Sequence, residues 1–99
     1  MLGAFIGDSI GSLLEFEEGD CADEQIEKAM RMPGGGPWGL APGQVTDDSE
    51  IAMCQMRALL AGKGKLDIYK VALYYGLYMN SDPKCVGVNT RNTLGLLGD

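Results

Sequence analysis

The stretch 33–43 (PGGGPWGLAPG) divides the 99-residue chain and limits what either side of it can form. It holds three prolines and five glycines, a composition that excludes a regular helix or strand. Eleven such residues in a small domain indicate a functional loop or a mobile one. Its only large side chain, Trp38, is typical of a residue that packs a loop down rather than one that stacks on a ligand. Regular structure must therefore form separately before and after this loop.

Apolar residues recur at helical spacing on both sides of the loop, and no segment alternates convincingly with the two-residue period of a strand. The chain is therefore predicted to be all-α, with about five helices and the Gly/Pro-rich loop before the third. The segment after Asp67, which is expected to cap it, is apolar nearly all round and should be largely buried. The predicted helices cover residues 2–14, 23–32, 47–61, 68–79 and 90–97.

The first predicted helix carries a glycine at every fourth position (Gly3, Gly7 and Gly11) and two acidic residues. Each glycine costs about 1 kcal/mol against alanine in a helix, so three on one stripe indicate close approach of another helix or of a ligand. Asp8 and Glu15 are nearly two turns apart and are expected on one side of this helix. In the second helix, Ile26, Ala29 and Met30 are expected to face inward.

The overall composition excludes several classes of function. A net charge of −6 disfavours a nucleic-acid-binding surface. Histidine is absent and the three cysteines are widely spaced, which argues against zinc ligation and His-based catalysis. No apolar run is long enough for a membrane span, and the acidic N-terminal segment does not resemble a secretory signal. We therefore expect a cytoplasmic protein with reduced cysteines that binds neither membranes nor nucleic acid.

The tripeptide Thr46-Asp47-Asp48 lies where the loop meets the third predicted helix. Thr46 or Asp47 could simply cap that helix, because carboxylates and hydroxyls satisfy the free N–H groups of its first turn. Alternatively, the three side chains could present oxygens to a hard cation such as Mg²⁺ or Mn²⁺. Three ligands from one tripeptide would make at most half of such a site, so the spacing alone leaves both interpretations open.

Three blocks of the sequence are informative in combination. The first is 3–16 (GAFIGDSIGSLLEF), which is similar to the opening helix of the ADP-ribosylglycohydrolase family. The second is 43–52 (GQVTDDSEIA), which resembles its first metal motif, with Ser49 where many members have threonine. The third is 78–83 (YMNSDP) followed by 87–90 (GVNT), which resembles a further block of the family. Together the three blocks cover nearly the whole chain. Their occurrence in the family's order makes the resemblance specific.

The resemblance implies an all-α fold with two Mg²⁺ ions in a central cleft, and Mn²⁺ as a possible substitute. It implies that Thr46, Asp47 and Asp48 bind metal, and that Glu15 and Asp48 serve catalysis. Backbone N–H groups of Gly87, Val88 and Asn89 are expected at the substrate diphosphate, although this turn could equally be an ordinary helix entry capped by Asn89. The implied reaction is hydrolysis of an ADP-ribosyl N- or O-glycosidic bond in a modified protein or a small conjugate.

The family's second metal motif, Asp-x-Asp followed by Thr or Ser, does not occur in this chain. Residues 1–99 are therefore interpreted as the N-terminal portion of one incomplete domain that needs a C-terminal portion to complete the site. We expect the 99 residues alone to be inactive. The alternative is a non-catalytic helical relative that binds ADP-ribose or serves a structural role.

Overall fold

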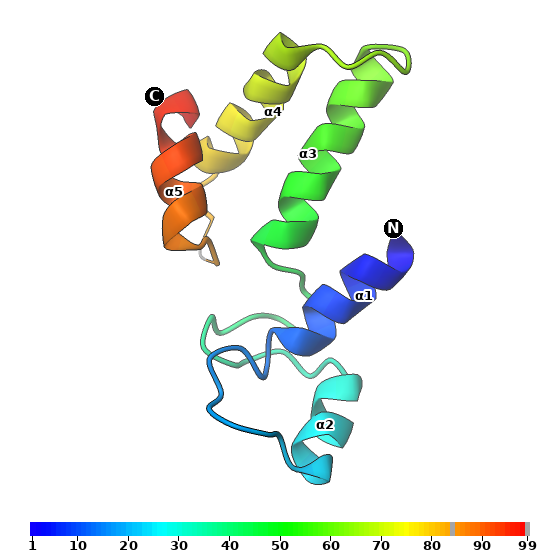
Figure 1. The fold of residues 1–99 in the computed structure, drawn as a ribbon, viewed down its shortest axis with the longest axis vertical. Coiled ribbons are helices and arrows are strands. Elements are labelled where there is room, and N and C mark those ends of the chain that lie inside the picture. Colours follow the sequence, from blue (N-terminus) through cyan, green and yellow to red (C-terminus); the bar gives the residue numbers. More distant parts are fainter. Residues whose placement is uncertain (84, 99) are drawn as a thin grey trace. The chain divides into compact units, whose positions relative to one another are not determined.

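The computed structural model describes residues 1–83 and 85–98, and this part of the chain is helical (Figure 1). Within it there is no strand, only an isolated antiparallel bridge between Gly35 and Leu40, so the predicted all-α class is confirmed. None of the described helices is long and apolar enough to cross a membrane. The elements are α1 (Leu2–Gly11), α2 (Asp23–Met30), α3 (Asp47–Ala61), α4 (Ile68–Asn80), α5 (Val88–Leu94) and the short 3-10 helix η1 (Gly95–Gly98).

The chain forms two compact units, Met1–Thr46 and Asp47–Asp99, and each is described by itself. The boundary falls inside the Thr-Asp-Asp tripeptide, after its first residue. The first unit contains α1, α2 and the Gly/Pro-rich loop. The second contains α3, α4, α5 and η1.

In the first unit, α1 ends at Gly11, three residues before the predicted end of the helix. The chain tightens there into turns, in which Leu14 N donates to the Gly11 carbonyl at 3.0 Å and Glu17 N donates to the Leu14 carbonyl at 3.1 Å. Phe16 takes a positive φ of 68°, which a helix does not allow. Glu15 therefore lies in a turn after α1, and the expectation that it shares a helix face with Asp8 was wrong.

The predicted close approach to the glycine stripe of α1 is not made by any residue that the structure describes. A Cβ built on Gly3, Gly7 or Gly11 meets no atom of the first unit within 4 Å. Nothing in this unit therefore approaches the stripe closely, and packing within it does not explain the three glycines.

The Gly/Pro-rich loop has an internal structure of its own. Gly43 N donates to the Met32 carbonyl at 3.1 Å and closes the base of the loop. Across the loop, Gly35 N donates to the Leu40 carbonyl at 2.7 Å and Leu40 N returns a bond of 3.1 Å, while the Leu40 side chain is buried. Gly36 has a φ of +69° and lies so close to α1's end that a Cβ would be 2.9 Å from the Ser12 carbonyl oxygen. The loop is thus held against the turn that follows α1.

Helix α2 ends at Met30, two residues before the predicted boundary, because Met32 adopts a positive φ of 49° ahead of Pro33. The predicted inward face is correct only in part. Ala29 is buried, but Ile26 and Met30 are exposed.

In the second unit, α3 has the predicted bounds. Its first turn is acidic, which the partial positive charge of a helix N-terminus favours. At its other end, Gly62 N donates to the Ala58 carbonyl at 2.9 Å, and Gly64 N donates to the Leu59 carbonyl at 2.8 Å. Gly64 has a φ of +85°. These bonds satisfy carbonyls that the helix leaves free, as expected for glycines at a helix end.

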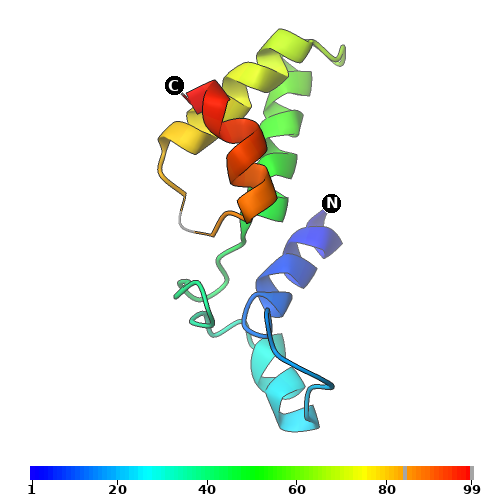
Figure 2. The ribbon, with the colours of Figure 1, turned by 60° about the vertical axis from the view of Figure 1, so that its left-hand side comes forward.

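Helix α4 runs back alongside α3, and α5 and η1 pack against α4 (Figures 1 and 2). Asp67 caps α4 as predicted, since its Oδ1 accepts from Tyr69 N at 2.9 Å. Gly76 lies very close to η1, because a Cβ there would be 2.5 Å from the Leu97 carbonyl oxygen. The predicted fifth helix also begins two residues earlier than expected, at Val88, and changes to 3-10 form at Gly95.

The prediction that α4 is largely buried was wrong. Only Gly76 is buried on this helix, whereas four of its large side chains are exposed: Ile68, Tyr69, Leu73 and Leu77. The buried apolar residues of the second unit are small or medium in size, namely Cys54, Ala58, Cys85 and Val86. Cys54 and Cys85 are buried, and Cys21 is partly exposed, in agreement with the prediction of partly buried cysteines.

Candidate functional site

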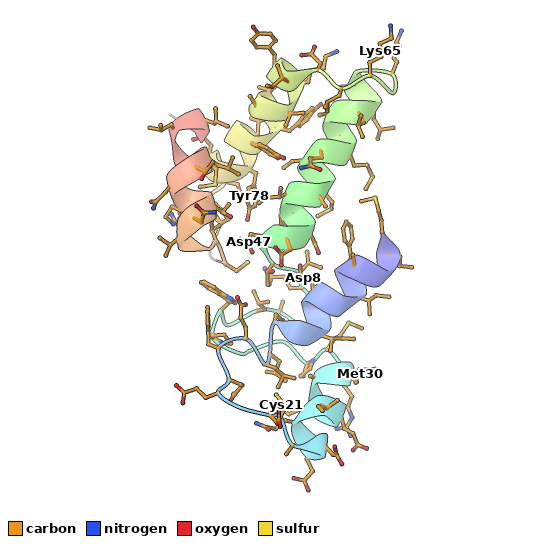
Figure 3. The ribbon with its side chains drawn as sticks, in the orientation of Figure 1. Asp8, Cys21, Met30, Asp47, Lys65 and Tyr78 are labelled. Carbon is orange, nitrogen blue, oxygen red and sulfur yellow. The ribbon has the colours of Figure 1, made fainter. Side chains whose placement is uncertain are left out.

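In the first unit, Asp8 and Thr46 form a two-point contact across 38 residues of sequence. Thr46 donates its backbone N–H to Asp8 Oδ2 at 2.9 Å and its hydroxyl to Asp8 Oδ1 at 2.5 Å. Thr46 is only 4% exposed, so this contact forms where water competes little. Asp8, labelled on α1 in Figure 3, thereby fixes the end of the Gly/Pro-rich loop. The sequence analysis did not assign Asp8 to the site. The feature that could have indicated it is the presence of a carboxylate in a largely apolar, glycine-rich helix.

Glu15 accepts a hydrogen bond from Trp38, which lies in the middle of the same loop. Trp38 donates its indole Nε1–H to Glu15 Oε2 at 2.6 Å, and its ring lies 5.9 Å from that of Phe16 at an interplanar angle of 58°. Trp38 thus packs the loop down, as its position predicted. The loop is consequently tied to α1 and its following turn by two of the acidic residues of the first unit.

In the second unit, Asp47 lies at the start of α3 and contacts the turn before α5 (Figure 3). Its Oδ2 accepts from Gly87 N at 3.2 Å, across 40 residues of sequence. Asp47 is half-buried, and its neighbour Asp48 is exposed. The structure therefore brings together one residue predicted to bind metal and one predicted to bind substrate.

The other two residues of that turn are more open. Val88 is exposed, and Asn89 lines a shallow hollow of about 210 Å³. Asn89 does not provide a side-chain cap to α5, whose cap position is Gly87. The hollow is also lined by Ile51, Tyr75, Thr90, Thr93 and Leu94.

Tyr78 is a feature of this unit that sequence reasoning missed. It projects from α4 toward α3 (Figure 3), where it lines a second hollow together with Glu50, Cys54 and Arg57. Its hydroxyl oxygen is buried and has no hydrogen-bond partner among the described residues. Burial raises the pKa of Tyr78 well above its usual value, and the nearby Cys85 and Asp47 add to the shift. Burial likewise raises the pKa of the Cys54 thiol.

The sequence was also compared with known proteins. The family model of the ADP-ribosylglycohydrolases matches residues 1–98. The chain belongs to the ADP-ribosylglycohydrolase family. The family resemblance predicted from the sequence is therefore confirmed.

Individual relatives match over nearly the same range. A protein of Acanthamoeba polyphaga mimivirus named as an ADP-ribosyl glycohydrolase is 40% identical over 95% of this chain and 29% of its own length. The ADP-ribosyl-[dinitrogen reductase] glycohydrolase of Rhodospirillum rubrum is 38% identical over 91% of this chain and 30% of its own length. An ADP-ribosylarginine hydrolase of Serratia proteamaculans is 37% identical over 95% of this chain and 26% of its own length. The chain thus spans less than a third of the length of these relatives.

Oxygen donors suited to a hard cation are present in this ADP-ribosylglycohydrolase chain, but they do not form a complete ion site. Thr46 supplies a hydroxyl and Asp47 and Asp48 supply carboxylates, which is the ligand chemistry that Mg²⁺ prefers. Across residues 1–83 and 85–98, however, no three Cys, Asp or Glu side chains lie close enough to share one ion. The three donors fit the ligand chemistry of the ion, and further ligands would have to come from water or from other parts of the protein.

Proposed function

We propose that this chain is the N-terminal part of a Mg²⁺-dependent hydrolase that cleaves ADP-ribosyl glycosidic bonds. The observation that carries the proposal is the family match over residues 1–98, which includes the Thr46-Asp47-Asp48 tripeptide. The names of the relatives, which include an ADP-ribosylarginine hydrolase, support an ADP-ribosylated protein or a small ADP-ribose conjugate as substrate. Mn²⁺ could replace Mg²⁺, because both prefer oxygen ligands.

Thr46, Asp47 and Asp48 would hold the metal, together with ligands from a C-terminal portion. The contact between Thr46 and Asp8 favours this role. Because the Thr46 hydroxyl donates its hydrogen to Asp8, its oxygen lone pairs are left available for a cation. The bound ions would orient the ribose hydroxyls and lower the pKa of a water molecule.

Glu15 and Asp48 are proposed as the carboxylates that accept a proton during the reaction. Trp38 supports this assignment for Glu15, because its N–H bond to Oε2 fixes the carboxylate and leaves Oε1 to accept a proton. For Asp48, the support is its exposure beside two further oxygen ligands.

Gly87, Val88 and Asn89 are proposed to bind the substrate diphosphate through backbone N–H groups. The Gly87 N–H already donates to Asp47, so a phosphate oxygen would have to share or replace that bond. Diphosphate and metal would consequently compete for or share the same few atoms, which links substrate binding to the position of Asp47.

One observation favours a second candidate, a non-catalytic relative that binds ADP-ribose without turnover. The described residues do not bring three acidic side chains together around one point. Such a protein would keep the helical scaffold and lack the chemistry.

The test is release of ADP-ribose from ADP-ribosylated arginine and serine peptides by the complete gene product. We expect release with Mg²⁺, loss of release with a chelator, and loss in Asp47→Asn. The matched control is Asp67→Asn, which removes a carboxylate that caps α4 and lies outside the tripeptide. The 99-residue chain alone should release none.

Calorimetric titration separates the two candidates. Binding of ADP-ribose by the complete gene product without release from either peptide would support the non-catalytic relative. Neither binding nor release, with no effect of chelator, would overturn both.

A further inference from the structure

An apolar groove lies between α3 and α4, near the turn that joins them. It has a volume of about 430 Å³, and its lining residues are Gln55, Leu59, Leu66, Ile68 and Val71. Leu66 is 75% exposed and Ile68 is 74% exposed, although both are aliphatic. Leu73 and Leu77 of α4 are exposed as well, but they do not line the groove. A surface of this kind, continuous over two helices, is typical of one that another polypeptide covers.

The lengths of the relatives indicate which polypeptide would cover the groove. More than two thirds of the length of each relative lies outside the region that this chain matches. The apolar side chains that a helical domain needs for its core are present here, but no large side chain is fully buried among the described residues. The part of the domain that lies outside the matched region in the relatives would therefore cover this exposed apolar surface.

The charge around the groove argues against a second copy of the chain as the occupant. Lys65, labelled in Figure 3, precedes Leu66 at the turn. Lys63, Asp67 and Lys70 lie close by in sequence, so this segment carries three positive charges and one negative charge. A second copy docked symmetrically would bring these lysines to the same rim, where like charges repel. The rim fits a partner with acidic side chains around an apolar helix.

We propose that the groove formed by Gln55, Leu59, Leu66, Ile68 and Val71 docks a helical segment from the C-terminal portion of an ADP-ribosylglycohydrolase domain, with apolar residues at its centre and acidic residues at its edge. Docking depends on family membership and not on catalysis. A failure of the docking experiment is therefore distinguishable from a failure of the proposed reaction.

The experiment uses this 99-residue chain and the Rhodospirillum rubrum relative without its matched N-terminal region. The two are mixed at equal concentration, and amide hydrogen exchange is followed by mass spectrometry. We expect exchange in 59–71 to slow by about tenfold on mixing, because docking protects amides that open locally in the free chain. Ile68→Glu should abolish this protection.

Tyr69→Glu is the matched control. Tyr69 neighbours Ile68 in the first turn of α4 and is 83% exposed, but it does not line the groove. This variant should keep the protection. Equal loss of protection in both variants would overturn the proposal, because the groove would then not be the specific contact.

A chimera covers the case in which the separate C-terminal portion does not fold. It joins this chain to the same portion of the relative in one polypeptide, and its melting temperature is measured. Ile68→Glu should lower that temperature and Tyr69→Glu should not. Equal melting temperatures for the three chimeras would contradict the proposal, as would a dimer of the free 99-residue chain that Ile68→Glu dissociates.

Discussion

At the scale of single residues, the buried Tyr78 hydroxyl is a cost to stability that a substitution can remove. A buried hydroxyl without a partner costs about 1–3 kcal/mol. Tyr78→Phe should therefore raise the free energy of unfolding or leave it unchanged. Tyr75→Phe is the matched control, because the Tyr75 hydroxyl accepts from Gln55 Nε2 at 2.6 Å and its loss should destabilise the protein. Urea unfolding of both variants is the measurement.

The same residue makes stability depend on alkaline pH. Its pKa is raised in the folded state above the ordinary value of 10.0, so above that pH the unfolded chain loses the proton first. The contribution of Tyr78 is fully present below about pH 10 and falls as the pH rises further. Tyr78→Phe should remove this part of the alkaline loss. An identical alkaline loss in the variant would show that other groups cause it.

A third prediction at this scale concerns Glu15 and Trp38. Trp38 is the only tryptophan, so tryptophan fluorescence reports on the surroundings of this one side chain. Glu15→Ala removes the acceptor of the indole N–H and should leave Trp38 more accessible to acrylamide quenching. Glu15→Gln keeps an acceptor oxygen and should quench nearly as the parent protein does. Unchanged quenching in Glu15→Ala would mean that the loop is held by other contacts.

These residue contacts mark the limit of what the sequence could predict. The Thr-Asp-Asp tripeptide and Glu15 stood out because their types and neighbours carry local signals. The partners of these residues did not, because Asp8 meets Thr46 across 38 residues and Asp47 meets Gly87 across 40. No periodicity links positions so far apart, and only the folded chain brings them together.

At the scale of elements, α4 and η1 pack at Gly76 so closely that only glycine fits. Alanine normally favours a helix over glycine by about 1 kcal/mol. Gly76→Ala should nevertheless destabilise the protein by about 1–3 kcal/mol, because its Cβ would lie 2.5 Å from the Leu97 carbonyl oxygen. Gly7→Ala, on the open stripe of α1, is the control and should stabilise it. Urea unfolding measures both, and stabilisation by Gly76→Ala would contradict the packing seen here.

Element boundaries were predictable where capping residues surround them and not where tertiary contacts set them. α3 begins at Asp47 and ends at Ala61, just before Gly62, and both boundaries were predicted from local chemistry. α1 ended early because the loop packs at Gly36 against the turn that follows Ser12, a contact that no local pattern reveals. α4 was predicted to be buried because of its apolar residues, but the described residues leave Ile68, Tyr69, Leu73 and Leu77 exposed.

At the scale of the whole molecule, the division into two units predicts how the chain unfolds. The single tryptophan, Trp38, lies in the unit Met1–Thr46, and all four tyrosines lie in the unit Asp47–Asp99. Each unit therefore has an optical reporter of its own. The buried apolar residues differ as well, since Ala29 and Leu40 serve the first unit while Cys54, Ala58, Cys85 and Val86 serve the second.

Because less apolar surface is buried in the first unit, we expect it to unfold at the lower urea concentration. Tryptophan fluorescence should report a transition that precedes the one seen by near-UV circular dichroism of the tyrosines. Gly76→Ala supplies the control, because it should move the tyrosine transition and leave the tryptophan transition in place. Coincident transitions that move together in Gly76→Ala would show that the 99 residues unfold as one cooperative structure, since two-state unfolding requires all probes to agree.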